Sequence, residues 1–239
     1  MILDIDHLAL CLDSYDEGNN FLSSIGYKCT YSIKEENNFK IKKPFLEKFS
    51  NTHDFALYNL ENSFGIEIIN HKNCVNKKAR IIPKFENNNF NINKYSKKIR
   101  ELLSDNIKRE KTNSDEKTIF NKIIFKTNNI IQSKKFWMCL GFSKINENIL
   151  EFSSIFNKKK YQIILEEDKK NSDLKLDYCG FNCIAFISNS IEEERIKLQK
   201  ENYFVSDIEE ISIKEKKLNL FFCRGPANEI IEIISPKIS

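Results

Sequence analysis

The sequence predicts an α+β fold in which one βαβββ unit occurs three times. Each copy opens with a short apolar strand, which leads into a helix that ends at Gly or Asn. One spacing is shared by three pairs of residues: His7 and Gly26, Lys122 and Gly141, and Cys183 and Asn202. Gly and Asn tolerate the left-handed backbone with which many helices end, so this spacing marks the same helix stop three times.

The closing strand of each copy repeats as well. The three segments are Ile66-Glu67-Ile68-Ile69, Tyr161-Gln162-Ile163-Ile164 and Ile231-Glu232-Ile233-Ile234. Agreement in both the helix stop and the closing strand indicates an internal repeat. The predicted boundaries are 1–72 for the first unit, 73–117 for a connector, and 118–236 for the second and third units, which are expected to form one domain.

In the first unit, the alternation of residues 2–12 predicts a half-buried strand. One face of this strand is expected to carry Ile5, His7, Ala9 and Cys11. The pattern Ser14-x-x-Glu17 is a capping box, in which each side chain binds a free backbone amide at the start of a helix. A polar loop is expected around residues 35–38. The later strands of the unit are predicted at 27–32, 53–60 and 64–70.

The connector departs from this pattern. A short strand is predicted at 79–82 and an amphipathic helix at 94–103, whereas residues 104–117 are charged and polar enough for a linker.

The second and third units follow the order of the first. In the second, the expected elements are a strand at 121–126, a helix at 131–140, and strands at 149–154 and 160–165. In the third, they are a strand at 181–187, a helix at 191–200 behind the capping box Ser190-x-x-Glu193, and a hairpin of residues 218–223 and 229–234. Trp137 falls in the apolar stripe of the second helix and is expected in the core.

Composition argues against several classes of function. The chain has 239 residues and a formal net charge of +4, and its lysines alternate with acidic residues. It therefore lacks the basic patch with which proteins bind nucleic acid or membrane surfaces. The N-terminal apolar stretch is neither a signal sequence nor a membrane span, because Asp4, Asp6 and His7 interrupt it. The seven cysteines include no CxxC pair, which predicts reduced thiols in a cytoplasmic protein and argues against a disulfide framework.

The repeated unit resembles that of the vicinal oxygen chelate superfamily, the group of glyoxalases, extradiol dioxygenases and bleomycin-resistance proteins. The segments that carry the resemblance are Ile5-Asp6-His7-Leu8-Ala9, Phe136-Trp137-Met138-Cys139-Leu140-Gly141-Phe142, and Phe221-Phe222-Cys223-Arg224-Gly225-Pro226 with Glu232 beyond it. The resemblance covers most of the chain outside the connector. It implies that the units pair into open, cup-like sheets of eight strands with the helices on the outer face.

The resemblance also implies a divalent metal inside the cup, bound by residues of the first and last strands of each unit. Carried over by position, these residues are His7 and Glu67, Lys122 and Gln162, and Cys183 and Glu232. Imidazole and carboxylate groups suit Zn, Fe, Mn or Ni, so His7 and Glu67 are the candidate metal ligands. Glu232 and Lys122 are the candidate catalytic residues, because a carboxylate can move a proton and an ammonium group can contact an anionic substrate.

Three pairings of the units remain open. The short connection between units two and three favours their pairing, but that cup would contain Lys122, whose ammonium group repels a cation. Units one and three would instead bring together His7, Glu67, Cys183 and Glu232, a set that suits zinc or iron. The third option pairs unit one with its copy in a second chain. A homodimer is expected because an unpaired unit leaves an open sheet edge.

The function that the resemblance implies is that of an enzyme acting on a small oxygenated metabolite through a divalent metal. Its class would be isomerase, lyase or dioxygenase. The alternative is a metal-free protein that binds a small molecule, or a biosynthetic accessory protein, in which the metal site is degenerate. A scaffold whose cups are filled by side chains is a third option. His53 and His71 are expected at the surface, and Cys183 is expected to be buried.

Overall fold

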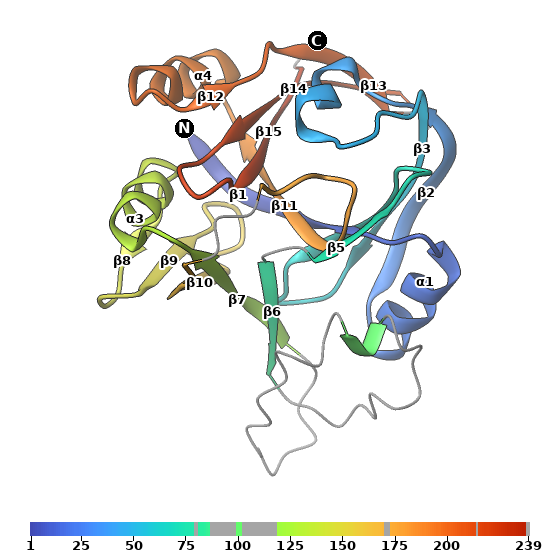
Figure 1. Cartoon of the computed structure of the whole chain (residues 1–239), viewed down its shortest axis with the longest axis horizontal. Coiled ribbons are helices and arrows are strands. Elements are labelled where there is room, and N and C mark those ends of the chain that lie inside the picture. The colour runs from blue at the N-terminus through green and yellow to red at the C-terminus, as the bar shows by residue number, and fades with distance from the viewer. Residues whose placement is uncertain (79–80, 87–98, 102–118, 170–172, 214, 238–239) are drawn as a thin grey trace.

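The first unit supplies four neighbouring strands of one large sheet. The structure is a computed structural model, and it describes residues 1–78, 81–86, 99–101, 119–169, 173–213 and 215–237. The elements of unit one are β1 (Ile2–Cys11), α1 (Tyr15–Ser24), β2 (Lys28–Asn37), the 3-10 helix η1 (Lys40–Phe45), β3 (Thr52–Asn59) and β4 (Gly65–Asn70). The strands lie in the order β2-β3-β4-β1, so the first strand of the unit is at the inner edge (Figure 1).

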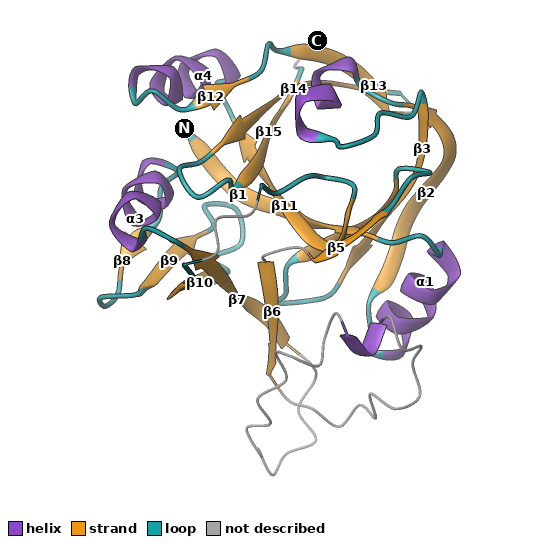
Figure 2. Ribbon diagram, in the orientation of Figure 1, coloured by secondary structure: helices purple, strands orange, loops and turns teal. Residues whose placement is uncertain are grey.

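The second and third units repeat this plan. Unit two contains β7 (Ile119–Thr127), α3 (Ile130–Cys139), β8 (Ser143–Lys144), β9 (Ile149–Ser153) and β10 (Lys160–Glu167). Unit three contains β11 (Tyr178–Ser188), α4 (Ile191–Lys200), β12 (Phe204–Val205), β13 (Glu209–Ile213), β14 (Lys216–Arg224) and β15 (Ile230–Pro236). The three predicted repeats are therefore confirmed at the level of secondary structure (Figure 2).

Unit one pairs with unit three, through antiparallel pairing of β1 with β11. On the far side of β11 lie β15 and then β14, so the two units form one continuous sheet within a single chain. The expectation that units two and three pair, which rested on their short connection, is wrong. Because β11 occupies the edge of β1, the third option, in which unit one pairs there with a second chain, is not what the structure shows.

The connector provides the neighbour of unit two. It contains β5 (Val75–Lys78), which pairs with β11, and β6 (Ile81–Glu86), which pairs with both β7 and β11. The strand predicted at 79–82 lies partly outside the described residues, and β6 begins within it. Of the helix predicted at 94–103, only residues 99–101 are described, and these are helical. The linker predicted at 104–117 lies outside the described residues.

Local signals in the sequence explain where the helices begin and end. The Ser14 hydroxyl accepts a hydrogen bond from the Glu17 amide at 3.3 Å, as the capping box predicts. Gly26, Gly141 and Asn202 all have the positive φ expected of a helix stop. Ser190 occupies the cap position of α4, but its side chain makes no capping hydrogen bond. Part of the second capping-box prediction is therefore wrong.

Two predictions for the strands of unit one need correction. Ile5 shares the face of Leu8 and Leu10, opposite to Ala9, because a register shift between Ile5 and His7 interrupts the alternation of β1. The polar loop expected at 35–38 is largely strand, since β2 extends to its end at Asn37. A positive φ at Glu35 and a register shift between β2 and β3 accommodate the polar residues there.

The helices cover the face of the sheet opposite to Ala9. Their buried residues, which include Phe21, Trp137 and Leu198, share one hydrophobic core with Leu8 of β1. A second core on the other face contains Ala9. Figure 1 shows α1, α3 and α4 at the periphery of the molecule. Trp137 is fully buried, as expected. Among the described residues, no helix has the length and apolar character needed to cross a membrane.

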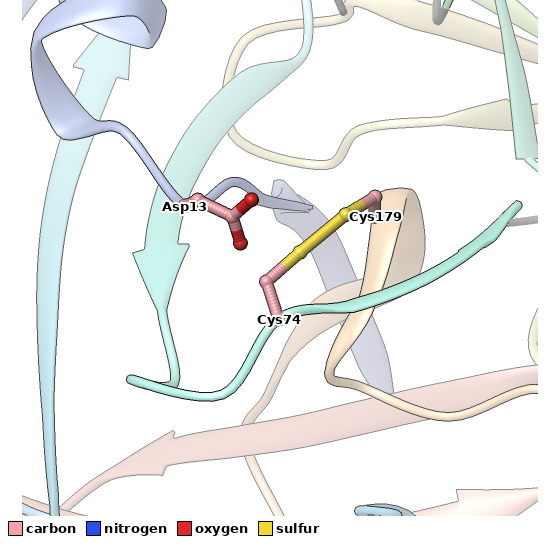
Figure 3. Close-up of side chains that lie close together, drawn as sticks. All are labelled: Asp13, Cys74 and Cys179. Atoms are coloured by element: carbon pink, nitrogen blue, oxygen red, sulfur yellow. A yellow bond between two sulfur atoms is a disulfide. The ribbon is translucent and has the colours of Figure 1, made fainter.

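A disulfide joins the connector to unit three. Cys74 lies just before β5, and its sulfur is bonded to that of Cys179 in β11 (Figure 3). The expectation that all cysteines are reduced is therefore wrong, because the pairing of β5 with β11 brings together two cysteines 105 positions apart in the sequence. The other five cysteines are free thiols.

We predict that this disulfide contributes to stability. Cross-linking residues that are 105 positions apart restricts the unfolded chain, so Cys74→Ser should lower the free energy of unfolding by about 2–5 kcal/mol. Denaturant unfolding with and without a thiol reductant measures the effect. The reductant should destabilise the parent protein but not Cys74→Ser, and Cys29→Ser, at an exposed free cysteine, should behave as the parent. Equal sensitivity of the parent and Cys74→Ser to the reductant would contradict the prediction.

Candidate functional site

The pairing of β1 with β11 places His7 and Glu232 in one row across three strands. His7 lies opposite Ala185 of β11, and Ala185 lies beside Glu232 of β15. Residues aligned across neighbouring strands project their side chains to the same face. Because alanine is small, the space between His7 and Glu232 is left open above the sheet.

A second row brings Glu67 to the same face. Glu67 of β4 lies beside Ala9, two residues after His7, and Ala9 lies opposite Cys183 of β11. His7 itself lies beside Gly65. A Cβ atom at that glycine would overlap the backbone oxygen of Asp6. The absence of a side chain therefore lets β4 pair closely with β1 next to His7.

The two halves of the site are related by the repeat. His7, Ala9 and Glu67 in unit one correspond to Cys183, Ala185 and Glu232 in unit three, and the register is symmetric about the β1–β11 junction. The sequence option that pairs units one and three therefore describes the site, with its four positions on one face.

His7 is held between three carboxylates. Its Nδ1 atom lies 2.8 Å from Oδ2 of Asp6, and its Nε2 atom lies 3.5 Å from Oε2 of Glu67 and 3.9 Å from Oε2 of Glu232. The side chain of His7 is 7% exposed, and those of Glu67 and Glu232 are 15% and 10% exposed. Within the described part of the chain, Nε2 has no hydrogen-bond partner.

The electrostatics of this group follow from burial and mutual contact. Burial opposes the charged form of His7, but the charges of Glu67 and Asp6 and the hydrogen bond to Asp6 outweigh it and raise the pKa of His7 well above its ordinary value. Burial acts to raise the pKa of Glu67, yet His7 and Lys42 bring that pKa below its ordinary value. Burial raises the pKa of Glu232, although Lys42 and His7 oppose the shift. The favoured charge state is an imidazolium of His7 beside a carboxylate of Glu67.

Cys183 stands where the repeat would place a second histidine. The side chain is buried, as expected. Burial, reinforced by the charge of Glu232, raises the pKa of the Cys183 thiol well above its ordinary value. Because the thiolate is the metal-binding form of cysteine, Cys183 is a weak ligand in this setting.

The site opens into a large cavity. Its volume is about 1280 Å³, and its polar lining includes Asp6, His7, Lys42, His53, Glu67 and Glu232. Apolar side chains from β3, β13, β14 and β15 form much of the remaining wall. A cavity with a few polar groups and mostly apolar walls is typical of small-molecule sites.

Comparison with known proteins identifies the fold. No family model and no curated protein sequence matches the chain. Two crystal structures of glyoxalase I mutants from Zea mays are similar to it, each at 12% sequence identity over 97% of this chain. The alignments cover 92% and 93% of the two glyoxalase I chains, and the TM-scores are 0.55 and 0.56. The chain has the vicinal oxygen chelate, or glyoxalase-like, fold.

This result confirms the fold that the sequence predicted, including its α+β class. At 12% identity the similarity shows the fold alone. Proteins with one fold often differ in activity, so the argument about function rests on the residues of the cup.

The glyoxalase-like cup does not include Lys122. This residue lies on β7 of unit two, between Lys84 of β6 and Gln162 of β10. Neither Lys122 nor Gln162 is among the described residues that line the cavity around His7. Glu232 shares the cavity with His7, whereas the structure does not bring Lys122 to it. The reason is that β7 of unit two pairs in the sheet with β6 and not with a strand of unit three.

His53 and His71 are buried, so the expectation of surface positions is wrong. Each is 1% exposed, and their ring centroids lie 6.0 Å apart. Nδ1 of His53 lies 3.1 Å from Oδ1 of Asn38. Burial, together with the charge of Lys42, lowers the pKa of His53 to about 2 and that of His71 well below its ordinary value. Both histidines are therefore neutral at physiological pH.

The sequence did not single out Lys42, which the structure places in the cavity. Lys42 belongs to η1, a helix that was not predicted, and its side chain is buried. It stands in a stretch with several other lysines, and the pattern offers no signal that distinguishes it from them.

A separate cluster of potential ligand atoms lies away from the cup. The carboxylate of Asp13 and the sulfur atoms of Cys74 and Cys179 all lie within 4.8 Å of one another (Figure 3). Metals bind the thiolate form of cysteine, and here the two sulfurs are bonded to each other. We therefore assign no metal to this cluster.

We predict a pH dependence of stability that originates at His53. Its folded-state pKa is about 2, below the unfolded value of 6.5, so the unfolded state binds the proton more tightly and stability falls as pH falls below 6.5. Between about pH 7.5 and about pH 5.5, the parent should lose roughly 1.4 kcal/mol more than His53→Gln. Denaturant unfolding at both pH values gives the loss of unfolding free energy for each protein. Comparing the two losses isolates His53, because the other ionisable groups are present in both proteins. Equal losses in the two proteins would show that His53 is not buried in its neutral form.

Proposed function

We propose that the cup formed by units one and three binds a divalent metal through His7 and Glu67 and acts on a small oxygenated metabolite. The observation that carries the proposal is the buried Nε2 atom of His7, which has no hydrogen-bond partner among the described residues and faces two carboxylates. A buried polar atom without a partner is costly, and a ligand that binds it removes the cost.

The geometry around His7 fits a metal. Asp6 lies 2.8 Å from Nδ1, so a proton on Nδ1 can be shared with that carboxylate. A metal ion would displace the proton from Nε2, whose freed lone pair would then point toward Glu67 and Glu232. A carboxylate that fixes the tautomer and orientation of a histidine is a common feature of metal sites. The nitrogen and oxygen donors suit Zn, Fe, Mn or Ni.

The residues of the cup have different proposed roles in the reaction. A metal bound at His7 and Glu67 would supply Lewis-acid polarisation of substrate oxygens. Glu232 lies beside that position and is the proposed proton carrier, because a carboxylate next to a bound substrate can accept a proton from it and return the proton to a neighbouring atom. The apolar walls around the cavity exclude water from the substrate. Proton transfer of this kind is typical of isomerases and lyases, so we propose an activity in one of these classes, with oxygenase chemistry as a further class.

A metal-free function is the second candidate, and one observation favours it. His7 and Glu67 have pKa shifts in opposite directions, which make them an ion pair that balances its own charge. In this alternative, the glyoxalase-like cup binds a small molecule directly, as an accessory or ligand-binding protein would. Cys183 in place of a second histidine fits the same alternative.

Two further expectations belong to the proposal. A cytoplasmic location is one of them: the five free thiols, of which Cys29 is exposed, agree with it, whereas the Cys74–Cys179 disulfide is a feature more common outside the cytoplasm. A homodimer would cover sheet edges outside the cup, since β1 and β11 complete the cup within one chain.

We predict that the protein, purified without chelators, contains about one equivalent of Zn, Fe, Mn or Ni, and that His7→Ala removes it. Elemental analysis gives the metal content. His53→Gln is the matched control, because His53 is another buried histidine of unit one but is not a proposed metal ligand. This variant should keep its metal.

Thermal unfolding of the metal-depleted protein provides an independent measurement. Adding back the metal at about 100 times its Kd should stabilise the parent by about 2.7 kcal/mol and leave His7→Ala unchanged. Absence of metal in the purified protein, combined with no stabilisation by any of the four ions, would reject the metal site and leave the metal-free alternative.

A further inference from the structure

A buried lysine of the cup, Lys42, forms no ion pair with any of the residues that the structure describes. Lys42 is 5% exposed. Its Nζ atom lies instead over two aromatic rings, 5.0 Å from the centroid of Phe39 and 5.9 Å from that of Phe222. Taking an ammonium group out of water is costly, and cation–π contacts offset only part of that cost.

Lys42 lines the same cavities as the carboxylates of the site. Lys42 lines the large cavity and also a small adjoining cavity of about 10 Å³, and Glu67 and Glu232 line both. Its charge affects the pKa of both carboxyl groups and of His53 and His71. Lys42 therefore faces the same space as the proposed metal ligands.

The segment that carries Lys42 is fixed to unit three. The Asp177 carboxylate accepts hydrogen bonds from the backbone amides of Glu47 and Lys48, and Glu209 accepts one from the amide of Ile41. Phe45, at the end of η1, is fully buried against Phe222. In Figure 1, η1 is the light-blue helix beside β14. With both ends held, Lys42 cannot easily withdraw its side chain into solvent.

We propose that Lys42 binds the carboxylate group of an anionic substrate whose apolar part lies against the walls of the cup. This inference rests on the proposed function and names the class of its substrate. A single negative charge matches the one buried ammonium group among the described lining residues, whereas Glu67 and Glu232, which line the same space, would repel a doubly charged phosphate more strongly than a carboxylate. The walls near Lys42 include Phe55, Ile211 and Leu220, which suit an alkyl or aryl group.

Binding of simple carboxylates to the full-length chain tests the proposal. The probes are butyrate, benzoate and phenylacetate, with phenylacetamide as the uncharged control and phenyl phosphate as the doubly charged one. Calorimetric titration should detect binding of at least one carboxylate. The two controls, phenylacetamide and phenyl phosphate, should bind more weakly. Lys42→Met should weaken carboxylate binding by about 10- to 150-fold, the effect of losing one hydrogen bond to a charged group. Lys42→Arg should retain most of the affinity.

Two variants separate this effect from a general loss of structure. Lys217→Met removes a lysine at the rim of the cavity, where it pairs with Glu210, and should bind carboxylates like the parent. Lys42→Met should unfold at the same temperature as the parent or higher, because replacing a buried ion with an apolar side chain of similar volume is often neutral or stabilising.

The outcomes distinguish this proposal from that of the metal site. Titrations are carried out on the protein as purified and after metal depletion. Loss of carboxylate binding in Lys42→Met together with absence of metal would support the anion site and reject the metal. Equal binding by the parent and Lys42→Met, binding of phenyl phosphate alone, or no binding of any carboxylate to the parent would each overturn the assignment of Lys42.

Discussion

The antiparallel pairing of β1 with β11 is the constraint on which the rest of the structure depends. It joins the first and third units into one sheet and places their corresponding residues symmetrically about the junction. His7 and Glu232 come from opposite ends of the sequence, and only this pairing puts them in one row. The same pairing leaves unit two to border β6, which separates Lys122 from the cup. One hydrogen-bonded edge therefore decides both the composition of the site and what is excluded from it.

The charge state of each ionisable group in the cup depends on which charged groups lie next to it. Asp6, Glu67 and Glu232 place three carboxyl groups around His7, and Lys42 adds a buried ammonium group in the same cavity. Burial acts against each charged form, so the state of every group depends on its neighbours. The result is a site with a complementary pair, His7 and Glu67, and a buried lysine that forms no ion pair with the described residues. The nitrogen and oxygen donors of His7 and Glu67 support the proposed metal site, their ion pair favours the metal-free alternative, and the lysine supports the proposed carboxylate site.

Much of the fold follows from signals that are local in sequence. Helix caps, left-handed stops and alternating apolar residues act within a few positions, so the three βαβββ units could be predicted from the sequence. Predictions from local patterns were wrong at positions where a contact between distant segments overrides the local pattern. The register shift in β1 turned Ile5 to the helical side. Burial of His53 and His71 depends on strands and a helix that are distant in sequence from each other.

The sequence by itself determined the repeat, the α+β class, the glyoxalase-like resemblance, and the two residues of unit one proposed as metal ligands. These depend on residue types at fixed spacings, which the chain displays directly. The tertiary structure alone decided which units share a sheet, that Cys74 and Cys179 are joined, and that Lys42 enters the cavity. Each of these is a contact between segments far apart in the chain. Many pairings of equivalent strands satisfy the same apolar pattern, and only the packing of the whole chain selects among them.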